Sequence, residues 1–355
     1  MKKSLLKWLS CPFCKNRLKL EIISCKEDEI VEGRLNCPCD QKYPIINGVP
    51  RLMHNRLRKE LSLLYPDFFK RNSDLFDGKK NTKKEKLSER SMQTMNRFGY
   101  EWLYFSDYNC DNFNAFIRPL PDNFFIGKLG LDIGCGAGRH AMQASKKGSE
   151  IIAIDLSQAV DAAQQNNSTN KLVHIIQADI YNLPFKAGIF DFIYSLGVLH
   201  HLSEPENGYK TLIPFLREGG ALFIWLYVFS LRKNVLEILR AVAKRLSNNN
   251  VRRMAFLCNM IDYGIFINLF RFAHNMPVLG KWVKKFTPLR IIEYSKHGFR
   301  ISYTDWFDRL SAPITNYYKE NEMKLWLKRS ELCKTKLLLE GDSWWWLYGE
   351  RKVEL

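Results

Sequence analysis

Three segments of the chain pair an apolar run with residues that could hold a nucleotide-like ligand. Residues 131–138 (LDIGCGAG) form a glycine-rich turn directly after a short apolar stretch. The next apolar stretch ends in Asp155, and the one after it ends in Asp179. A carboxylate about twenty residues after such a turn can accept hydrogen bonds from a ribose diol, and a second carboxylate can accept from an exocyclic adenine amine. Together these segments predict a cleft for a ligand that has both ribose and adenine.

The glycine spacing narrows the class of ligand. Glycines occupy alternate positions 134, 136 and 138, which differs from the G-x-G-x-x-G of dinucleotide-binding turns. Glycine has no Cβ, so we expect the backbone here to approach a ligand closely. A turn that does not cradle a pyrophosphate favours S-adenosylmethionine over a nicotinamide dinucleotide.

Alternating strand-like and helix-like segments must position these residues. Apolar runs predict strands near 129–133, 150–154, 172–177, 189–194 and 220–227. Between them, helices are predicted over 138–147, 157–167 and 207–217. A helix over 320–330 and two strands, near 336–339 and 344–348, close the chain. Strands joined by crossover helices pair in parallel and are buried on both faces, so the fold class is α/β.

The first fifty residues carry two cysteine pairs with the spacing of metal ligands. Cys11 and Cys14 form a C-x-x-C knuckle, and Cys37 and Cys39 form a shorter C-x-C knuckle. Each knuckle can present two sulfurs on one side of a tight turn, which suits a tetrahedral zinc ion. Four thiolates leave no open coordination position, so such a zinc would be structural. Because the second knuckle is short, Cys25 is a substitute ligand to consider, and a redox pair is the alternative to zinc.

The formal charge of +17 is concentrated in one segment. Residues 231–300 hold fourteen Lys or Arg and three acids. This excess predicts an anionic partner, which could be a nucleic acid, a membrane surface or an acidic substrate, although a solvated helix face is an equal interpretation. No apolar run reaches the roughly 18 residues of a membrane span. Nine cysteines without a secretory signal predict a reducing, cytoplasmic setting.

On these motifs the chain resembles the class I S-adenosylmethionine-dependent methyltransferases, and the type 11 group among them. Residues 131–138 are similar to that family's first motif, 154–157 to its ribose-binding strand end, and 177–180 to its adenine-binding motif. The resemblance covers about 128–228 plus the two closing strands. It implies a Rossmann-like sheet of seven strands, the last antiparallel. It also implies that the following residues contact the cofactor: Asp132, Gly134, Cys135, Gly136, Asp155, Leu156, Asp179, Ile180 and Leu196.

The first fifty residues resemble the small zinc-ribbon family that activates tRNA and protein methyltransferases. Besides the cysteines, the match lies in YPIINGVP, residues 43–50. We therefore predict a zinc-ribbon-like domain over 1–55, then a linker and helical cap over 56–125 with its most mobile part at 78–84. A methyltransferase domain follows over 126–355, with a helical insertion at about 230–305. The aromatic segment 98–105 is expected to be helical and to pack its apolar face on the main domain, with direct contact to a ligand as the alternative.

Methyl transfer is an in-line displacement at a sulfonium carbon, so the protein mainly aligns the reactants and excludes water. His200 and His201 follow the fourth strand of the sheet, where the acceptor should approach the methyl group. His201 is the better candidate for a general base, because the resemblance implies a histidine there. His297, Asp305 and Asp308 lie near the end of the insertion and just beyond it, in a stretch expected to line the acceptor side, and are weaker candidates.

Three hypotheses for the function follow. The leading one is a soluble methyltransferase that acts on a small-molecule, sugar-linked or lipid-linked acceptor, with the insertion shaping the acceptor pocket or touching an anionic surface. The alternative is an RNA methyltransferase that holds RNA with the zinc ribbon and the basic insertion. Against it, the fourth-strand region lacks the Asn/Asp-Pro-Pro-Tyr/Phe motif of enzymes that methylate base amines. The third is a non-catalytic adaptor that binds S-adenosylmethionine, which the intact glycine turn and both acids disfavour.

Overall fold

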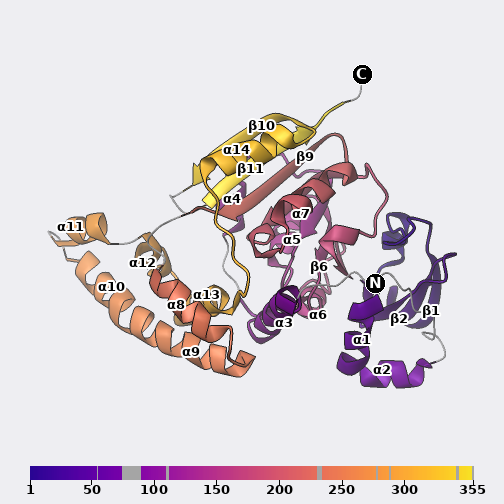
Figure 1. Ribbon diagram of the computed structural model, residues 1–355, viewed down its shortest axis with the longest axis horizontal. Coiled ribbons are helices and arrows are strands. Elements are labelled where there is room, and N and C mark those ends of the chain that lie inside the picture. Colours follow the sequence, from indigo (N-terminus) through magenta and orange to yellow (C-terminus); the bar gives the residue numbers. More distant parts are fainter. Residues whose placement is uncertain are drawn as a thin grey trace.

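One mixed sheet of eleven strands runs through the described part of the chain. Its strand order is β1-β2-β3-β4-β7-β6-β5-β8-β9-β11-β10, and Figure 1 shows it flanked by helices. The computed structural model describes residues 1–53, 55–73, 89–108, 112–229, 234–276, 279–287, 289–340 and 344–353. The segment 78–84, predicted to be the most mobile part of the linker, lies outside these described residues.

Seven strands form the methyltransferase part of this sheet. Five of them are parallel neighbours: β5 (Leu129–Ile133), β6 (Glu150–Asp155), β7 (Val173–Ala178), β8 (Phe190–Leu196) and β9 (Leu216–Tyr227). The closing strand β11 (Trp344–Arg351) pairs antiparallel with both β9 and β10 (Leu332–Glu340). The predicted strands and the antiparallel last strand are therefore confirmed. β9 begins four residues earlier than predicted.

The helices between these strands bury both faces of the sheet. They are α5 (Arg139–Lys146), α6 (Ala159–Asn166), α7 (Pro205–Leu212) and α14 (Glu320–Arg329). Ile152 and Ile154 belong to one core cluster, whereas Ile151 and Ala153 belong to the other, as the alternation of side chains along a strand requires. Helix α7 ends five residues earlier than predicted, in a 3-10 turn over Ile213–Phe215, because a proline at position 214 has no N–H with which to continue an α-helix.

The cysteine-containing segment is joined to the same sheet. After a 3-10 turn (Lys3–Lys7), the strands β1 (Lys19–Lys26), β2 (Glu29–Asn36), β3 (Lys42–Ile46) and β4 (Val49–Leu52) pair antiparallel. Strand β4 then pairs parallel with β7, with Arg51 opposite Gln177 and Leu52 opposite Ala178. The four strands of the ribbon thus continue the seven predicted strands in one sheet, because an edge strand has unpaired backbone groups and β4 pairs with those of β7.

In the described residues of the predicted linker and cap, the structure has four helices. They are α1 (Asn55–Leu64), α2 (Pro66–Arg71), α3 (Glu89–Tyr104) and α4 (Phe113–Ile117). Helix α3 contains most of the aromatic segment and packs against both α6 and α13, so it joins the sheet domain to the insertion.

The insertion consists of helices and forms an arm at the opposite end of the molecule from the ribbon (Figure 1). Its elements are α8 (Asn234–Ala243), α9 (Asn248–Ile261), a π-helical segment (Asp262–Ile267), α10 (Asn268–His274), α11 (Leu279–Phe286), α12 (Leu289–Tyr294) and α13 (Phe299–Ser311). Phe105, Val251 and Phe307 belong to its small core. Residues 248–274 form one continuous helix that is long and apolar enough to cross a membrane, which the sequence analysis did not anticipate.

Candidate active site

A cavity opens at the carboxyl ends of β5, β6, β7 and β8, where ligands bind in open α/β sheets. Eight of the nine predicted cofactor residues line it: Gly134, Cys135, Gly136, Asp155, Leu156, Asp179, Ile180 and Leu196. Asp132 is not among the lining residues and is 2% exposed. Burial raises the pKa of the Asp132 carboxyl to about 7. Asp132 is thus a buried acid of β5 rather than a cavity wall.

Backbone and hydroxyl donors of the adjoining loops orient the two acids in the cavity. Asp155 Oδ2 accepts from the backbone N–H of Gly136 at 3.0 Å, and Oδ1 accepts from the backbone and hydroxyl of Ser157 at 2.8 and 2.6 Å. Burial raises the pKa of Asp155, and these bonds oppose the rise. Asp179 Oδ1 accepts from the backbone N–H of Tyr181 at 3.0 Å and caps the 3-10 turn Ile180–Asn182. Both carboxylates are held in place before any ligand arrives.

The glycine turn is required by its own backbone and by neighbouring side chains. Gly134 and Gly136 have φ of +75° and +53°, in the left-handed region that favours glycine. A Cβ on Gly134 would lie 2.5 Å from the Val198 side chain, and one on Gly136 would lie 2.9 Å from the indole nitrogen of Trp102. This clash within the protein is a second reason for glycine at these positions, beside the predicted close approach of the backbone to a ligand.

Helix α3 forms a wall of the cavity that sequence reasoning missed. Its lining residues are Ser91, Thr94, Met95, Phe98 and Trp102, whose spacing places them on one helical face. The aromatic segment 98–105 was expected to pack on the main domain, with contact to a ligand as the weaker alternative. Phe105 does pack in the core, whereas Phe98 and Trp102 line the cavity. The helical period of the lining positions was the signal available in the sequence.

Two polar side chains, His201 and Asp308, also line the cavity. His201 Nδ1 lies 2.7 Å from the carbonyl oxygen of Ile314, so Nδ1 donates and Nε2 is left as an acceptor. Burial lowers the pKa of His201 to about 4. Asp308 comes from α13 of the insertion, and burial, together with the charge of Asp305, raises its pKa to about 6. At neutral pH both groups are therefore unprotonated, and the Asp308 carboxylate is the stronger base of the two.

The other predicted catalytic candidates lie outside the residues that line this cavity. His200 is fully buried, with its ring centroid 4.0 Å from that of Tyr227. Asp305 forms an ion pair with Arg309 at 2.7 Å. The carbonyl oxygen of His297 accepts from the Tyr263 hydroxyl at 3.0 Å. Of the five predicted catalytic candidates, only His201 and Asp308 therefore line the cavity.

Glu101 is a buried acid that the sequence analysis did not single out. It lies on α3, is 0% exposed, and accepts from the Ser311 hydroxyl at 3.5 Å. Burial and the nearby Asp308 charge raise its pKa well above the usual range. No motif surrounds Glu101, so only the packing of α3 on α13 reveals that it is buried.

The four predicted metal ligands come together in the ribbon. The Sγ atoms of Cys11, Cys14, Cys37 and Cys39 all lie within 4.8 Å of one another. Separations of 3.8 Å (Cys11 to Cys39) and 3.3 Å (Cys14 to Cys37) are near the roughly 3.8 Å between thiolates at about 2.3 Å from a tetrahedral zinc. Cys25 is exposed on β1 and outside this cluster. The short second knuckle thus completes a closed set of four thiolates that fits a structural zinc ion.

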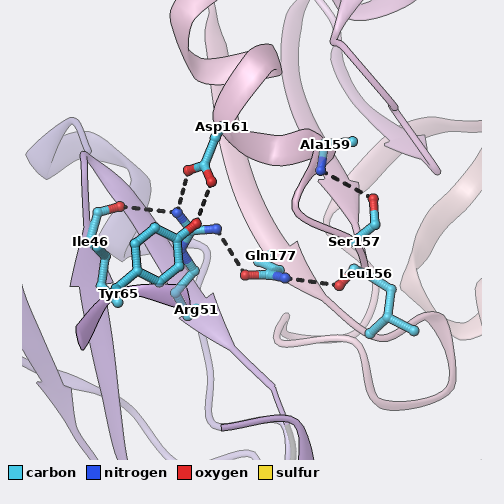
Figure 2. Close-up of polar contacts among 8 residues, drawn as sticks. All are labelled: Ile46, Arg51, Tyr65, Leu156, Ser157, Ala159, Asp161 and Gln177. Carbon is cyan, nitrogen blue, oxygen red and sulfur yellow. Dashed lines mark hydrogen bonds and ion pairs between the residues drawn. The ribbon is translucent and has the colours of Figure 1, made fainter. Parts of the chain in front are cut away.

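A chain of polar contacts connects the ribbon to the loop that follows β6, residues 155–158, which we call the cofactor loop because Asp155 is predicted to hold the cofactor (Figure 2). Arg51 on β4 is fully buried and donates to Gln177 Oε1 at 2.8 Å and to Asp161 Oδ1 at 2.5 Å. Gln177 Nε2 in turn donates to the carbonyl oxygen of Leu156 at 2.9 Å. Tyr65 also donates to Asp161. Since Leu156 follows Asp155 in the cavity wall, the ribbon supports the cofactor loop from outside the cavity.

Two protein families match the chain, in the two regions just described. Residues 131–224 match the methyltransferase domain family, and residues 2–48 match the Trm112p-like protein family. The first match includes the glycine turn and both cavity acids, and the second includes all four clustered cysteines.

Among curated proteins, the tRNA U34 carboxymethyltransferase of Psychromonas ingrahamii is 33% identical over 129 residues, 35% of this chain and 37% of that protein. The protein of the same name from Shewanella sp. ANA-3 is 28% identical over 231 residues, 63% of this chain and 61% of that protein. The chain thus spans between about a third and three fifths of the length of these relatives.

Among solved structures, human N-acetylserotonin methyltransferase in complex with SAM is 12% identical, with a TM-score of 0.43 over 72% of this chain and 56% of that one. A sequence identity and a TM-score this low carry no argument about the chemistry of the chain. The two family matches define the chain as follows: residues 131–224 match a methyltransferase domain, and ahead of it residues 2–48 match a Trm112p-like domain whose four clustered cysteines fit a zinc ion.

Proposed function

We propose that the chain transfers the methyl group of S-adenosylmethionine to an acceptor that enters beside His201 and Asp308. The observation that carries this proposal is the joining of the glycine turn, Asp155 and Asp179 in one cavity. In the proposed complex, Asp155 accepts hydrogen bonds from the ribose diol and Asp179 accepts from the adenine amine. When bound, the cofactor supplies a methyl group activated by the positive charge on its sulfur.

The residues beside the open part of the cavity suit proton removal from the acceptor. A general base works best when its pKa lies near the operating pH. The Asp308 carboxyl, with a pKa of about 6, meets this condition better than His201, whose pKa is about 4. We therefore assign the base to Asp308. His201 Nε2 then orients the acceptor by accepting a hydrogen bond.

RNA is the acceptor that the relatives support best. The curated relatives named above carry the name tRNA U34 carboxymethyltransferase, and one matches over 231 residues. The rings of Phe98, Trp102 and His201 line the cavity and could stack against a nucleobase. This replaces the small-molecule acceptor as the leading hypothesis. A lipid-linked acceptor stays a second candidate because the insertion exposes a large apolar face.

Cofactor binding tests the first part of the proposal. We expect isothermal titration to show binding of S-adenosylmethionine to the wild-type chain and a loss of about hundredfold for Asp155→Ala, since each hydrogen bond to a charged group contributes about 1.5–3 kcal/mol. The control is Asp122→Ala, which removes an exposed carboxylate outside the cavity. No binding by the wild type, or equal affinities for wild type and Asp155→Ala, would contradict the assignment.

Transfer of label from methyl-labelled S-adenosylmethionine tests the acceptor. Total tRNA, ribosomal RNA and a total lipid extract serve as parallel acceptors, with Asp155→Ala as the inactive control. We expect label in tRNA, and an RNA affinity that falls steeply with salt because phosphate contacts release counterions. Label in the lipid fraction alone would contradict RNA as the acceptor and support the lipid-linked acceptor. Cofactor binding without transfer to any acceptor would favour the non-catalytic adaptor.

A further inference from the structure

The insertion carries an apolar surface that the described protein does not cover. We call it the outer face; its exposed side chains are Phe256, Leu257, Met260, Ile261, Ile265, Phe266, Leu269, Phe272, Met276, Trp282 and Phe286. They belong to α9, the π-helical segment, α10, α11 and the turn between the last two. Figure 1 shows α9 and α10 along the outer edge of the arm. Soluble monomers rarely expose a contiguous apolar patch of this kind, so the outer face indicates a partner.

The opposite side of the same helix is bound to protein. Val251, Ala255, Asn259, Asp262, Ile267 and Phe270 are buried there. Asn259 donates to the carbonyl oxygen of Phe299 at 3.2 Å, and the Trp306 indole donates to Asp262 at 2.8 Å. These buried positions are three or four residues apart except across the π-helical segment, where the wider turn accommodates a step of five. One side of the helix is therefore held to its own protein by packing and polar contacts, and only its other side is available to a partner. An apolar face on one side of a helix suits a position in the interface of a membrane.

The charges around the outer face have one sign. Between Asn248 and Thr287 the sequence has six Lys or Arg and a single acid, Asp262, which is buried. Arg253 is exposed at one end of the apolar stretch, and Lys284 and Lys285 are exposed at the other. Cations that flank an apolar helical face are typical of helices that lie in the interface of an anionic membrane.

Helix α11 adds aromatic side chains of the kind found at membrane interfaces. Trp282 and Phe286 are 62% and 74% exposed, and their rings stack with centroids 6.3 Å apart. Tryptophan is enriched at the level of lipid headgroups because its ring is apolar and its N–H is polar. Lys284 and Lys285 lie on the same short helix.

We propose that the outer face docks this protein on the surface of an anionic lipid bilayer, lying in the interface without crossing it. A second copy of the chain fits less well, because a symmetric contact would bring the cations of both copies together with no exposed acid in this segment to pair with them. RNA would use the cations but would leave the apolar side chains exposed. The proposal goes beyond the proposed function and is compatible with either acceptor.

Sedimentation of the full-length chain with vesicles tests the proposal. We expect the wild type to bind phosphatidylcholine vesicles that contain a third phosphatidylglycerol at least tenfold more tightly than pure phosphatidylcholine vesicles. The triple variant Leu257→Gln/Leu269→Gln/Phe272→Gln should lose at least tenfold in affinity for the anionic vesicles. The matched control Leu63→Gln/Ile126→Gln/Leu339→Gln alters three exposed apolar residues elsewhere and should bind like the wild type.

Several results would overturn the proposal. Wild-type protein that stays in the supernatant with anionic vesicles excludes membrane docking, as does a triple variant that binds as well as the control. A dimer in size-exclusion chromatography that the triple variant dissolves, without vesicle binding, assigns the face to a second copy. RNA binding lost in the triple variant, again without vesicle binding, assigns it to RNA. Retention in membranes after alkaline carbonate would mean that the helix spans the bilayer.

The same variants separate this proposal from the proposed function. None of the altered residues lines the cofactor cavity, so the affinity of the triple variant for S-adenosylmethionine should equal that of the wild type. Loss of vesicle binding with normal cofactor binding supports docking by the outer face. Failure of the wild type to bind S-adenosylmethionine would refute the proposed function and leave the vesicle result unaffected.

Discussion

The ribbon and the insertion are both additions to the methyltransferase sheet, but they place their apolar and charged groups differently. The ribbon continues the sheet through the β4–β7 pair and buries Arg51 among polar partners. The insertion packs against the sheet domain through α3 and α13 and leaves the outer face exposed. The ribbon contributes no residue to the cavity lining, whereas the insertion contributes Asp308.

This difference indicates two roles: the ribbon stabilises the sheet domain, whereas the outer face contacts a partner. The ribbon buries most of its apolar side chains, with Phe13, Ile22 and Ile23 exposed. It stabilises its neighbours through the shared sheet and the contacts of Arg51, so its effects on the site are indirect. A region that exposes a contiguous apolar face has its partner outside the described protein. The comparison predicts that changes in the ribbon act mainly on stability, and that changes on the outer face leave stability almost unchanged.

The largest expected effect comes from the zinc ligands. Cys14→Ser should lower the zinc content from about one ion per chain and unfold the ribbon, because binding of structural zinc contributes on the order of 10 kcal/mol to the folding of small zinc domains. Elemental analysis and thermal unfolding measure the two effects. Cys25→Ser is the control, since that thiol is exposed outside the cluster. Equal zinc content in both variants would rule out the four-thiolate site.

Arg51→Ala should cost about 3–5 kcal/mol of stability, because it leaves the partners of a buried cation without their donor. It should also weaken binding of S-adenosylmethionine, since Gln177 then loses its hydrogen bond from Arg51. Denaturant unfolding and isothermal titration measure the two changes. The control Arg71→Ala removes an exposed ion pair with Glu32 and should cost about 1 kcal/mol or less. A stability loss with unchanged cofactor affinity would show that the ribbon does not support the cofactor loop.

Asp308→Asn should reduce the transfer rate about hundredfold, a typical contribution of a general base. The carboxylate must be ionised to accept a proton, and burial raises its pKa to about 6. The wild-type rate should therefore fall as the pH is lowered through about 6, and the variant should lack this limb of the pH profile. An unchanged acidic limb in Asp308→Asn would transfer the role of base to another group, with His201 the next to test.

The smallest expected effect is the loss of stability on truncating a side chain of the outer face, and it tests whether that face is exposed in the folded protein. Leu257→Ala should change the free energy of unfolding by about 0.5 kcal/mol or less, since an exposed side chain loses little on truncation. The same substitution at Leu310, which is buried in the core of the insertion, should cost about 2–5 kcal/mol. Denaturant midpoints distinguish the two. Similar losses at both positions would mean that the outer face is covered within the folded protein.

The sequence predicted those parts of the structure that depend on short-range pattern. Strands β5 to β9 could be located because each is a short apolar run bounded by a turn. Their carboxyl ends meet at one edge, so Asp155 and Asp179 could be placed in one cleft. Helix α3 was harder, because its aromatic residues suit a core as well as a cavity wall. Only the position of α3 over the glycine turn shows that Phe98 and Trp102 line the cavity.

By itself, the sequence determined the class of fold, the residues that line one end of the sheet as predicted for a cofactor, and the four cysteines that cluster, because each depends on residue types at short fixed spacings. The tertiary structure decided which of the proton acceptors line the cavity: Asp308 and His201 do, and His200 does not. It also decided that the ribbon extends the sheet and that one side of the 248–274 helix stays uncovered. Those outcomes depend on contacts between residues far apart in the chain, and local pattern does not specify such contacts.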